Sequence, residues 1–325
     1  MSLNHKTNVI LTIDTEVWIE DEDWHDIDAS FPEAFDTYIN GKTPNGDYGV
    51  PFLLKVLRDY GLQAVFFVEP LFSLRLKSGP ELLEEIVSSI QDAGQDVELH
   101  LHTEWLDKTK ESPLPNPGPS RENMKDYSYD EQRILLETGK ELLLRAGADG
   151  IRAFRAGNFG ANNDTLRALA TADIPFDSSY NPALPRRAIA TDKIFQQVGE
   201  LEGIIEVPMT TYIDGMNQQR PASFGACSSA EMESMLRSAN QQGWENFVVL
   251  THPIEFLNRR RTGKNSVIAR RLIEFCDFIA RNNDQFITAG FDSPSLRPYE
   301  KSTELLRCNF RPALFRIAEQ AWSRL

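Results

Sequence analysis

Short apolar runs alternate with longer amphipathic segments along most of the sequence, and this alternation restricts the fold more than any other feature. The run at residues 8–14 (NVILTID) is rich in β-branched side chains and is typical of a buried strand. The segment at 49–60 carries its leucines at helical spacing and is followed by Gly61 as a stop signal. Because strands and helices of this length alternate, the sequence predicts an α/β fold with a parallel sheet and helical crossovers.

The same pattern continues through most of the chain. The predicted strands cover 8–14, 63–68, 96–102, 150–155, 245–251 and 285–288, and a further strand begins at 175. The predicted helices cover 49–60, 80–93, 130–146, 163–173, 228–242 and 266–281. Asn163 and either Ser228 or Ser229 are expected to cap the helices that follow them. A hairpin is predicted between 194–198 and 203–207.

No internal repeat and no flexible linker divides the 325 residues, and 41% hydrophobic with 25% charged residues is an ordinary globular composition. We therefore predict a single barrel-like domain at 1–297. An irregular, acidic N-terminal loop at 18–48 decorates it. The tail at 298–325 is expected to be an amphipathic helix, interrupted at Pro312 and packed on the barrel.

The formal net charge of −14 argues against nucleic acid or an anionic membrane as the main partner. No apolar run approaches the roughly 18 residues that a membrane helix needs. The N-terminus has no apolar signal region, so a cytoplasmic location is expected. Cys227, Cys276 and Cys308 are far apart and odd in number, which favours neither a disulfide framework nor a thiolate zinc site. The oligomeric state stays open.

Polar side chains of catalytic types end several of the predicted strands. They are Asp14, His100 with His102, Arg155 and His252. In α/β barrels the active site lies at the carboxyl ends of the strands, where the following loops build it. Four separate strands that end in such residues therefore predict an active site at this face.

His100 and His102 are two residues apart in a strand, so their side chains are expected to point to the same face. A carboxylate, Glu104, follows directly. Two imidazoles with a nearby acid are typical ligands of a divalent metal. The alternative is a pair of satisfied polar residues at a strand end.

With these residues in view, the sequence resembles the polysaccharide deacetylases, also called the NodB-homology family or family-four carbohydrate esterases. The resemblance covers about residues 8–290. Five motifs carry it, in the order of the family: LTIDTE at 11–16, GQDVELHLHTEW at 94–105, FRAG at 154–157, FDSS at 176–179 and LTHP at 250–253. The family fold is a distorted (β/α) barrel of about seven parallel strands, which agrees with the alternation above.

The first motif of the family has two adjacent acids, of which the first is the general base and the second binds metal. Asp14 matches the base, but Thr15 stands at the position of the metal ligand. Some relatives place that ligand one residue later, so the resemblance implies Glu16 as the substitute.

The second motif implies two histidine ligands that are four residues apart. His100 matches the first, whereas the second falls on Glu104, with His102 beside it. The third ligand is therefore either Glu104 or His102. The implied cofactor is a divalent metal, with zinc as the expected ion.

The remaining motifs imply that Arg155 orients the base, that Asp177 partners the last histidine and that His252 is the general acid. A base, an acid and a metal are what amide hydrolysis needs. Each residue also has a structural alternative. The alternatives are a helix cap for Asp14, an ordinary ion-pair partner for Arg155 and a turn residue for Asp177.

Trp18, Trp24 and Trp105 lie beside the motif loops, where indole faces suit stacking on sugar rings. Packing beneath the loops is the alternative for each tryptophan. Trp18, Trp105 and Asn158 are our candidate substrate-binding residues. The basic cluster at 259–264 is interpreted as a solvated loop, with contact to an anionic sugar or phosphate as the alternative.

The combined prediction is a metal-dependent hydrolase that removes an N-acetyl or related acyl group from a carbohydrate. Two alternatives stay open. One is a non-catalytic carbohydrate-binding relative, because the usual second acid and second histidine are replaced. The other is an amidase on a small non-sugar amide, as in allantoinase-like relatives.

Overall fold

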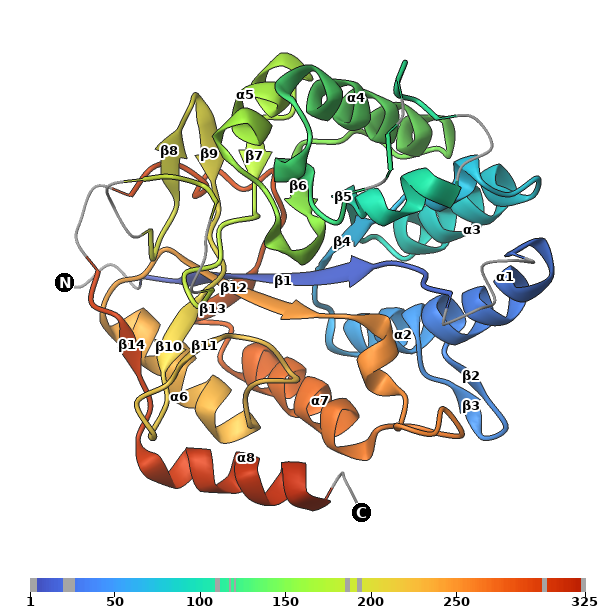
Figure 1. Ribbon diagram of the computed structural model, residues 1–325. Coiled ribbons are helices and arrows are strands. Elements are labelled where there is room, and N and C mark those ends of the chain that lie inside the picture. The colour runs from blue at the N-terminus through green and yellow to red at the C-terminus, as the bar shows by residue number, and fades with distance from the viewer. Residues whose placement is uncertain are drawn as a thin grey trace.

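The computed structural model describes residues 5–19, 27–108, 112–116, 118–119, 121–184, 188–191, 195–299 and 303–322 (Figure 1). Within these residues, one sheet of nine strands runs in the order β12-β1-β4-β5-β6-β7-β9-β8, and β13 also pairs with β1. The strands are β1 (Thr7–Thr15), β4 (Val65–Val68), β5 (Asp96–Leu101), β6 (Ala153–Ala156), β7 (Phe176–Asp177), β8 (Gly199–Leu201), β9 (Ile204–Glu206), β12 (Asn246–Thr251) and β13 (Phe286–Thr288). All pairs except β8–β9 are parallel.

The sheet curls, and helices cover its outer side (Figure 1). They are α2 (Val50–Tyr60), α3 (Gly79–Asp92), α4 (Tyr129–Arg145), α5 (Asn163–Thr171), α6 (Ser229–Gln241) and α7 (Ser266–Arg281). The segment between β9 and α6 forms a backbone hydrogen bond with β12, at the edge of the sheet: Leu250 donates its N–H to the carbonyl of Ala222. The predicted distorted (β/α) barrel is confirmed.

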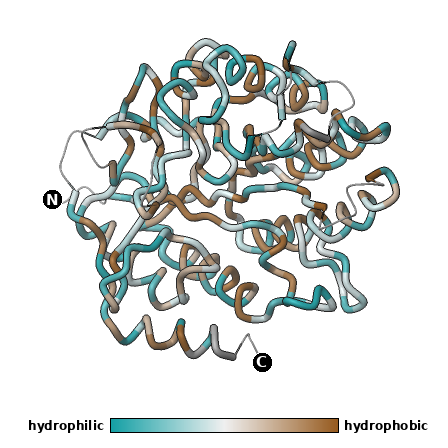
Figure 2. The backbone as a smooth tube through the Cα atoms, in the orientation of Figure 1, coloured by the Kyte–Doolittle hydropathy of each residue, from teal (hydrophilic) through white to brown (hydrophobic). Residues whose placement is uncertain are grey.

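Alternate residues of the strands point into the barrel, and they change from apolar to polar along each strand. A buried apolar cluster fills the lower interior, with Ile10, Val65, Phe67, Ala153 and Val248 among its members. A larger apolar cluster lies between the sheet and the helices. Figure 2 shows hydrophobic residues along the central strands. The polar ends of the inward-facing rows build the site described below.

Local signals place most helix ends where the sequence predicts them. Ser228 caps α6, and its hydroxyl and the Glu231 carboxylate form a capping box. The cap of α5 is Asn162 and not Asn163, because the Asn162 side chain accepts the N–H of Thr165. The prediction for Asn163 is therefore wrong by one residue.

Two other predictions need correction. Residues 18–48 are not wholly irregular, since they include α1 (Ile27–Phe35), a π-helix at Asp36–Asn40 and a hairpin of β2 (Lys42–Thr43) with β3 (Gly46–Asp47). The hairpin predicted around 199–202 is shifted: β8 and β9 pair around Glu202 and Gly203, whose positive φ angles form the turn. Much of the acidic stretch, 20–26, lies outside the described residues.

The C-terminal segment contributes to the fold through β14 (Leu306–Arg307) and α8 (Phe310–Trp322). β14 extends a small sheet with β10 (Thr211–Ile213) and β11 (Gln219–Pro221). Pro312 does not interrupt α8 but lies in its first turn, where a missing N–H costs nothing. The buried Arg316 guanidinium donates to Asp214 at 2.7 Å and to Glu231. Across the described residues, α8 and the other helices are too short or too polar to cross a membrane.

Candidate active site

The inward-facing rows of β1, β5, β6 and β12 bring polar side chains together at their carboxyl ends. Asp14 lies in β1 with Glu16 just after it, His100 lies in β5 with His102 just after it, and Arg155 lies in β6. His252 follows β12 directly. Neighbouring strands pair in register, so His100 lies opposite Arg155 across the β5–β6 pair. The sheet thus gathers residues that are far apart in the sequence.

Arg155 fixes the position of Asp14. Its fully buried guanidinium donates from Nη1 to Oδ1 of Asp14 at 2.6 Å and to the hydroxyl of Thr12 at 2.9 Å. The Nη2 atom donates to the hydroxyl of Ser178 at 3.1 Å, and the guanidinium lies 4.4 Å from the Phe67 ring centre. These contacts hold one carboxylate oxygen of Asp14 and leave Oδ2 directed elsewhere.

The protonation of His100 follows from its contacts. Its Nδ1 lies 2.8 Å from the backbone carbonyl of Arg155, which can only accept a hydrogen bond, so Nδ1 carries the proton. In the neutral ring, Nε2 then has a free lone pair. This lone pair faces the Glu16 carboxylate, with 3.4 Å between Nε2 and Oε2. Two acceptors that face each other in this way are compatible with a cation between them.

His102 lies between two carboxylates. Its Nε2 is 2.5 Å from Oε2 of Glu16, and its Nδ1 is 3.3 Å from Oε2 of Glu104. Burial acts to lower the pKa of His102, but these two acids raise it to about 10. The same imidazoles hold the pKa of Glu16 well below its ordinary value, against the effect of burial. The Asn158 amide donates to the other oxygen of Glu104 at 3.2 Å and so orients that acid.

The residues at this point fit a divalent metal. One ligand atom each from Glu16, His100 and His102 lies within 4.8 Å of the other two. The buried Oε2 of Glu16 has no hydrogen bond of normal geometry among the described residues. Two imidazole nitrogens and one carboxylate oxygen are a donor set typical of zinc. The contact of His102 with Glu104 then matches the carboxylate that commonly orients a metal-bound histidine.

His252 faces Asp14 from the neighbouring strand. Its Nε2 lies 3.9 Å from Oδ2 of Asp14, and its Nδ1 lies 3.2 Å from Oε1 of Glu255. Burial lowers the pKa of His252, whereas Glu255 and, more weakly, Asp14 and Glu16 raise it, with a net pKa of about 9. The imidazole is therefore protonated at neutral pH.

Solved structures match the chain along nearly its whole length. A provisionally assigned polysaccharide deacetylase from Mycobacterium smegmatis has 18% identity and a TM-score of 0.55, covering 94% of this chain and 97% of that one. The chain has the polysaccharide deacetylase fold. No family model and no curated protein matches the sequence.

Two further solved structures match less well. A family-four carbohydrate esterase pseudoenzyme from Bacillus anthracis has 14% identity and a TM-score of 0.45, covering 94% of this chain and 70% of that one. A family-four carbohydrate esterase from Streptomyces lividans, solved with acetate, has 12% identity and a TM-score of 0.39, covering 87% and 92%.

Within this deacetylase fold, Asp177 does not partner His252 as predicted. Asp177 pairs in register with Phe154, whose side chain belongs to the outer cluster, so its carboxylate also points away from the barrel interior. The next residue, Ser178, faces inward and contacts Arg155. The FDSS motif at 176–179 therefore contributes Ser178 to the site, and not Asp177.

Asp177 belongs instead to a separate buried group. Its carboxylate accepts a hydrogen bond from the Ser179 hydroxyl at 2.7 Å. Across the β7–β9 pair, Asp177 lies opposite Glu206. Burial raises the pKa of both acids, and the proximity of Asp177 raises that of Glu206 further. The acid that contacts His252 is Glu255, which lies one turn further in a short 3₁₀ helix at Pro253–Phe256.

Glu69 is a second acid near the site that the sequence analysis missed. It follows β4 directly, and its fully buried carboxylate accepts the N–H groups of Leu71 and Phe72 at 2.8 and 3.2 Å. Burial raises its pKa to about 8, although these two N–H groups and His102 act to lower it. Its place after an apolar strand is the signal that could have revealed it.

The predicted substrate-binding residues differ in their positions. Trp105 is fully buried against Phe31 and Phe72, so it is a core residue and cannot stack on a sugar. Trp18 is half-buried, and its ring lies 4.7 Å edge-on from His102. Asn158 lies beside the site through Glu104. Trp24 lies outside the described residues.

The backbone after β6 passes close to His102 and has an unusual conformation. A Cβ atom on Gly157 would lie 2.7 Å from Nδ1 of His102, so only glycine permits this close approach. Asn158 and Phe159 follow with positive φ angles of 56° and 53°. Such angles are unfavourable for these side chains and cluster at functional sites.

Proposed function

We propose that the protein is a metal-dependent hydrolase that removes an N-acetyl or related acyl group from a carbohydrate. One observation carries the proposal: the group formed by Glu16, His100 and His102 lies beside Asp14 and His252, which face each other. A metal ligand set and an acid–base pair in one place are what amide hydrolysis requires. The fold agrees with this assignment but does not by itself carry a function.

Glu16, His100 and His102 would hold the ion. A divalent ion bound by these residues supplies a Lewis acid for the acyl oxygen and lowers the pKa of water. Glu104 would keep His102 in the tautomer that leaves its Nε2 lone pair free, because its carboxylate accepts a hydrogen bond from Nδ1–H. His100 and His102 are buried, and electrostatic interactions are stronger in such a low-dielectric environment than in water.

Asp14 is suited to the role of base. Arg155 binds one of its oxygens and stabilises the carboxylate, so Oδ2 remains to accept a proton from an attacking water. The buried guanidinium also fixes the rotamer of Asp14, which holds the base in one position.

His252 is suited to the role of acid. Its Nδ1 is bound to Glu255, so the proton available to a leaving amine is the one on Nε2, which faces the site. The raised pKa keeps this proton in place at neutral pH. The amine leaves only after protonation, so this donor promotes cleavage of the C–N bond.

The proposal is tested with purified full-length protein and a panel of acylated substrates. The panel contains N-acetylglucosamine oligomers, acetylated xylo-oligosaccharides and small non-sugar amides, with release of free amine or acetate as the readout. We expect turnover of an N-acetylated sugar after addition of zinc and its loss after chelation. Turnover of the small amides alone would instead support an amidase, and zinc binding with no turnover of any substrate would support a binding protein.

A further inference from the structure

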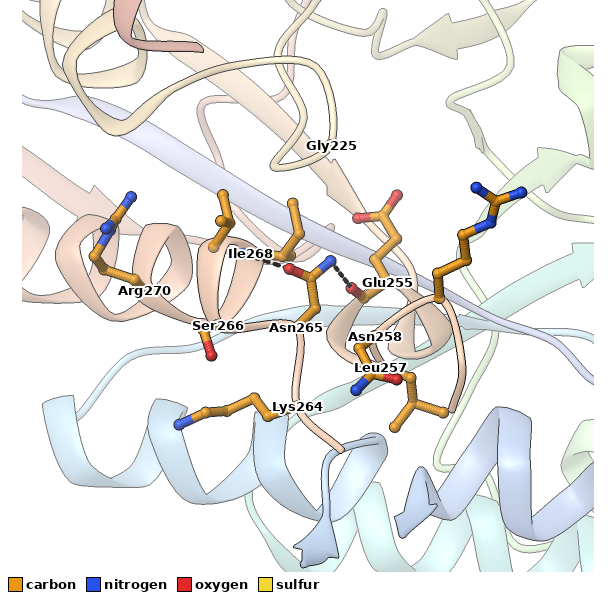
Figure 3. Close-up of a pocket in the computed structure, with 11 residues that line it drawn as sticks. Gly225, Glu255, Leu257, Asn258, Lys264, Asn265, Ser266, Ile268 and Arg270 are labelled. Atoms are coloured by element: carbon orange, nitrogen blue, oxygen red, sulfur yellow. Dashed lines mark hydrogen bonds between the residues drawn. The ribbon is translucent and has the colours of Figure 1, made fainter. Parts of the chain in front are cut away.

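A cavity of about 710 Å³ lies beside the active site, between the 3₁₀ helix at Pro253–Phe256, the first turn of α7 and the segment that carries Gly225 (Figure 3). Its volume lies in the range of sites that bind small molecules. The proposed mechanism uses none of its residues except Glu255.

Glu255 connects the cavity to the site. One oxygen of its carboxylate contacts Nδ1 of His252 at 3.2 Å, and the other accepts the hydroxyl of Thr251 at 2.8 Å. Figure 3 shows this carboxylate at the cavity, pointing toward the segment with Gly225. A Cβ atom on Gly225 would lie 3.5 Å from Oε1, so the segment passes close to the acid. A group in the cavity therefore lies next to the acid that holds His252.

The charge of the cavity is opposite to that of the chain. Three cations line it, namely Arg259, Lys264 and Arg270, against the single acid Glu255, although the whole chain has a net charge of −14. Arg270 is already paired with Glu319 and contributes little free charge. Arg259 and Lys264 are exposed and form no ion pair among the described residues. Lys264 Nζ lies 5.9 Å from the centre of the Tyr48 ring, a contact that leaves its charge without an acidic partner.

Neutral donors add to these charges. Asn265 caps α7 and accepts the N–H of Ile268 at 3.3 Å. The N–H groups of Ser266 and Val267, in the same first turn, have no acceptor within the helix, and both residues line the cavity. Backbone N–H groups at this end of a helix favour an anion.

We propose that this cavity is a subsite for an anionic group of the substrate, a phosphate or a carboxylate attached to the sugar. The inference rests on the proposed function only where it identifies the ligand as the substrate. The binding of an anion here is a property of the cavity itself. Arg259 and Lys264 supply the attraction, and the first turn of α7 supplies directional donors. The sugar then extends from the cavity past Glu255 toward His252 and Asp14.

Binding is measured by titration calorimetry of the full-length, zinc-loaded protein at low salt. The probes are N-acetylglucosamine 6-phosphate, glucuronate and neutral N-acetylglucosamine. The variants Arg259→Gln and Lys264→Gln each remove one cation from the cavity. Arg260→Gln is the matched control, because this arginine is also exposed and adjacent in sequence but does not line the cavity.

We expect an anionic probe to bind more tightly than the neutral sugar. Arg259→Gln and Lys264→Gln should each weaken it roughly tenfold, while Arg260→Gln stays within about twofold. The phosphate and carboxylate probes show which group the subsite takes. The inference is overturned if neither anion binds more tightly than the neutral sugar, or if Arg260→Gln weakens binding as much as the two cavity variants.

The same experiment separates the two proposals. Hydrolysis of neutral N-acetylated sugars without any preference for anions would keep the proposed function and remove the subsite. Anion binding that depends on Lys264 in a protein with no hydrolytic activity would keep the anion site and remove the proposed function.

Discussion

The imidazole of His252 faces the carboxylate of Asp14 across the β1–β12 pair, with 3.9 Å between Nε2 and Oδ2. This distance is longer than a hydrogen bond, so the proton of His252 is not held by Asp14. Each residue has its own partner on the far side, Arg155 for Asp14 and Glu255 for His252. An acid and a base can therefore lie side by side without neutralising each other.

Replacement of Asp14 by Asn should abolish turnover while zinc stays bound. The amide keeps the shape of the carboxylate but cannot accept a proton, and the ligand atoms belong to other residues. We expect a rate loss of at least a hundredfold, measured with saturating zinc. The buried Arg155 loses its ionic partner, so the melting temperature is measured in parallel. Unchanged turnover in a folded variant would exclude Asp14 as the base.

His102 and Glu104 should differ in their effect on metal affinity. His102→Ala removes a proposed ligand and should abolish tight zinc binding. Glu104→Gln removes only the acid that orients the histidine and should weaken zinc binding about 10- to 100-fold at unchanged stoichiometry. Competition with a chromophoric chelator measures both affinities. If Glu104→Gln abolished binding and His102→Ala did not, Glu104 would be the third ligand.

The pH profile of kcat/KM should depend on Glu255 and not on Asp177. Glu255 raises the pKa of His252, so Glu255→Gln lowers that pKa, and the alkaline limb of the profile moves to lower pH by about one unit. Asp177→Asn is the control, because this carboxylate points away from the site. A shift in the control alone would restore Asp177 as the partner of His252.

The stability of the metal-free protein should fall as the pH rises from 7 to about 9. Glu98 is a buried acid of β5 whose carboxylate accepts the N–H groups of Arg152 and Ala153 at 2.7 Å. The folded-state pKa values of His252, about 9, and of Glu69 and Glu98, about 8, all lie above those of the unfolded chain. Each group binds its proton more tightly in the folded state, so its contribution is present at low pH and is lost as the pH passes the folded pKa.

Thermal unfolding of the chelated protein at a series of pH values measures this effect. The melting temperature should fall by roughly 2 °C or more for each kcal/mol of stability that is lost. A melting temperature that rises between pH 7 and 9 would contradict the assigned shifts. In the metal-free protein His102, with a pKa of about 10, adds to this fall in stability, and zinc binding should remove its part because coordination requires a neutral imidazole.

The sequence was sufficient to predict the barrel and most of the residues that gather at its carboxyl face. Apolar runs that end in Asp14, His100, Arg155 and His252 identify one face of a parallel sheet, since parallel strands end at the same edge. Which residues of a strand face the interior, however, depends on the register of that strand with its neighbours. Asp177 was assigned to His252 by the resemblance alone, and a strand of only two residues offers no alternation in the sequence that could have corrected this.

Contacts made by loops were beyond reach of the same argument. Glu255 contacts His252 because a 3₁₀ turn follows β12, and no strand or helix periodicity predicts that turn. Trp105 is adjacent to the motif in sequence, yet its side chain packs against α1, a helix that the sequence analysis treated as irregular. Whether Glu104 or His102 completes the ligand set depended on side-chain directions in the same way.

The central claim is that Glu16, His100 and His102 bind one divalent ion, and anomalous diffraction from zinc-soaked crystals tests it most directly. We predict a single zinc peak about 2.0–2.2 Å from Nε2 of both histidines and from a carboxylate oxygen of Glu16. A site without zinc, or zinc bound elsewhere while Glu16 remains in contact with His102, would contradict the claim.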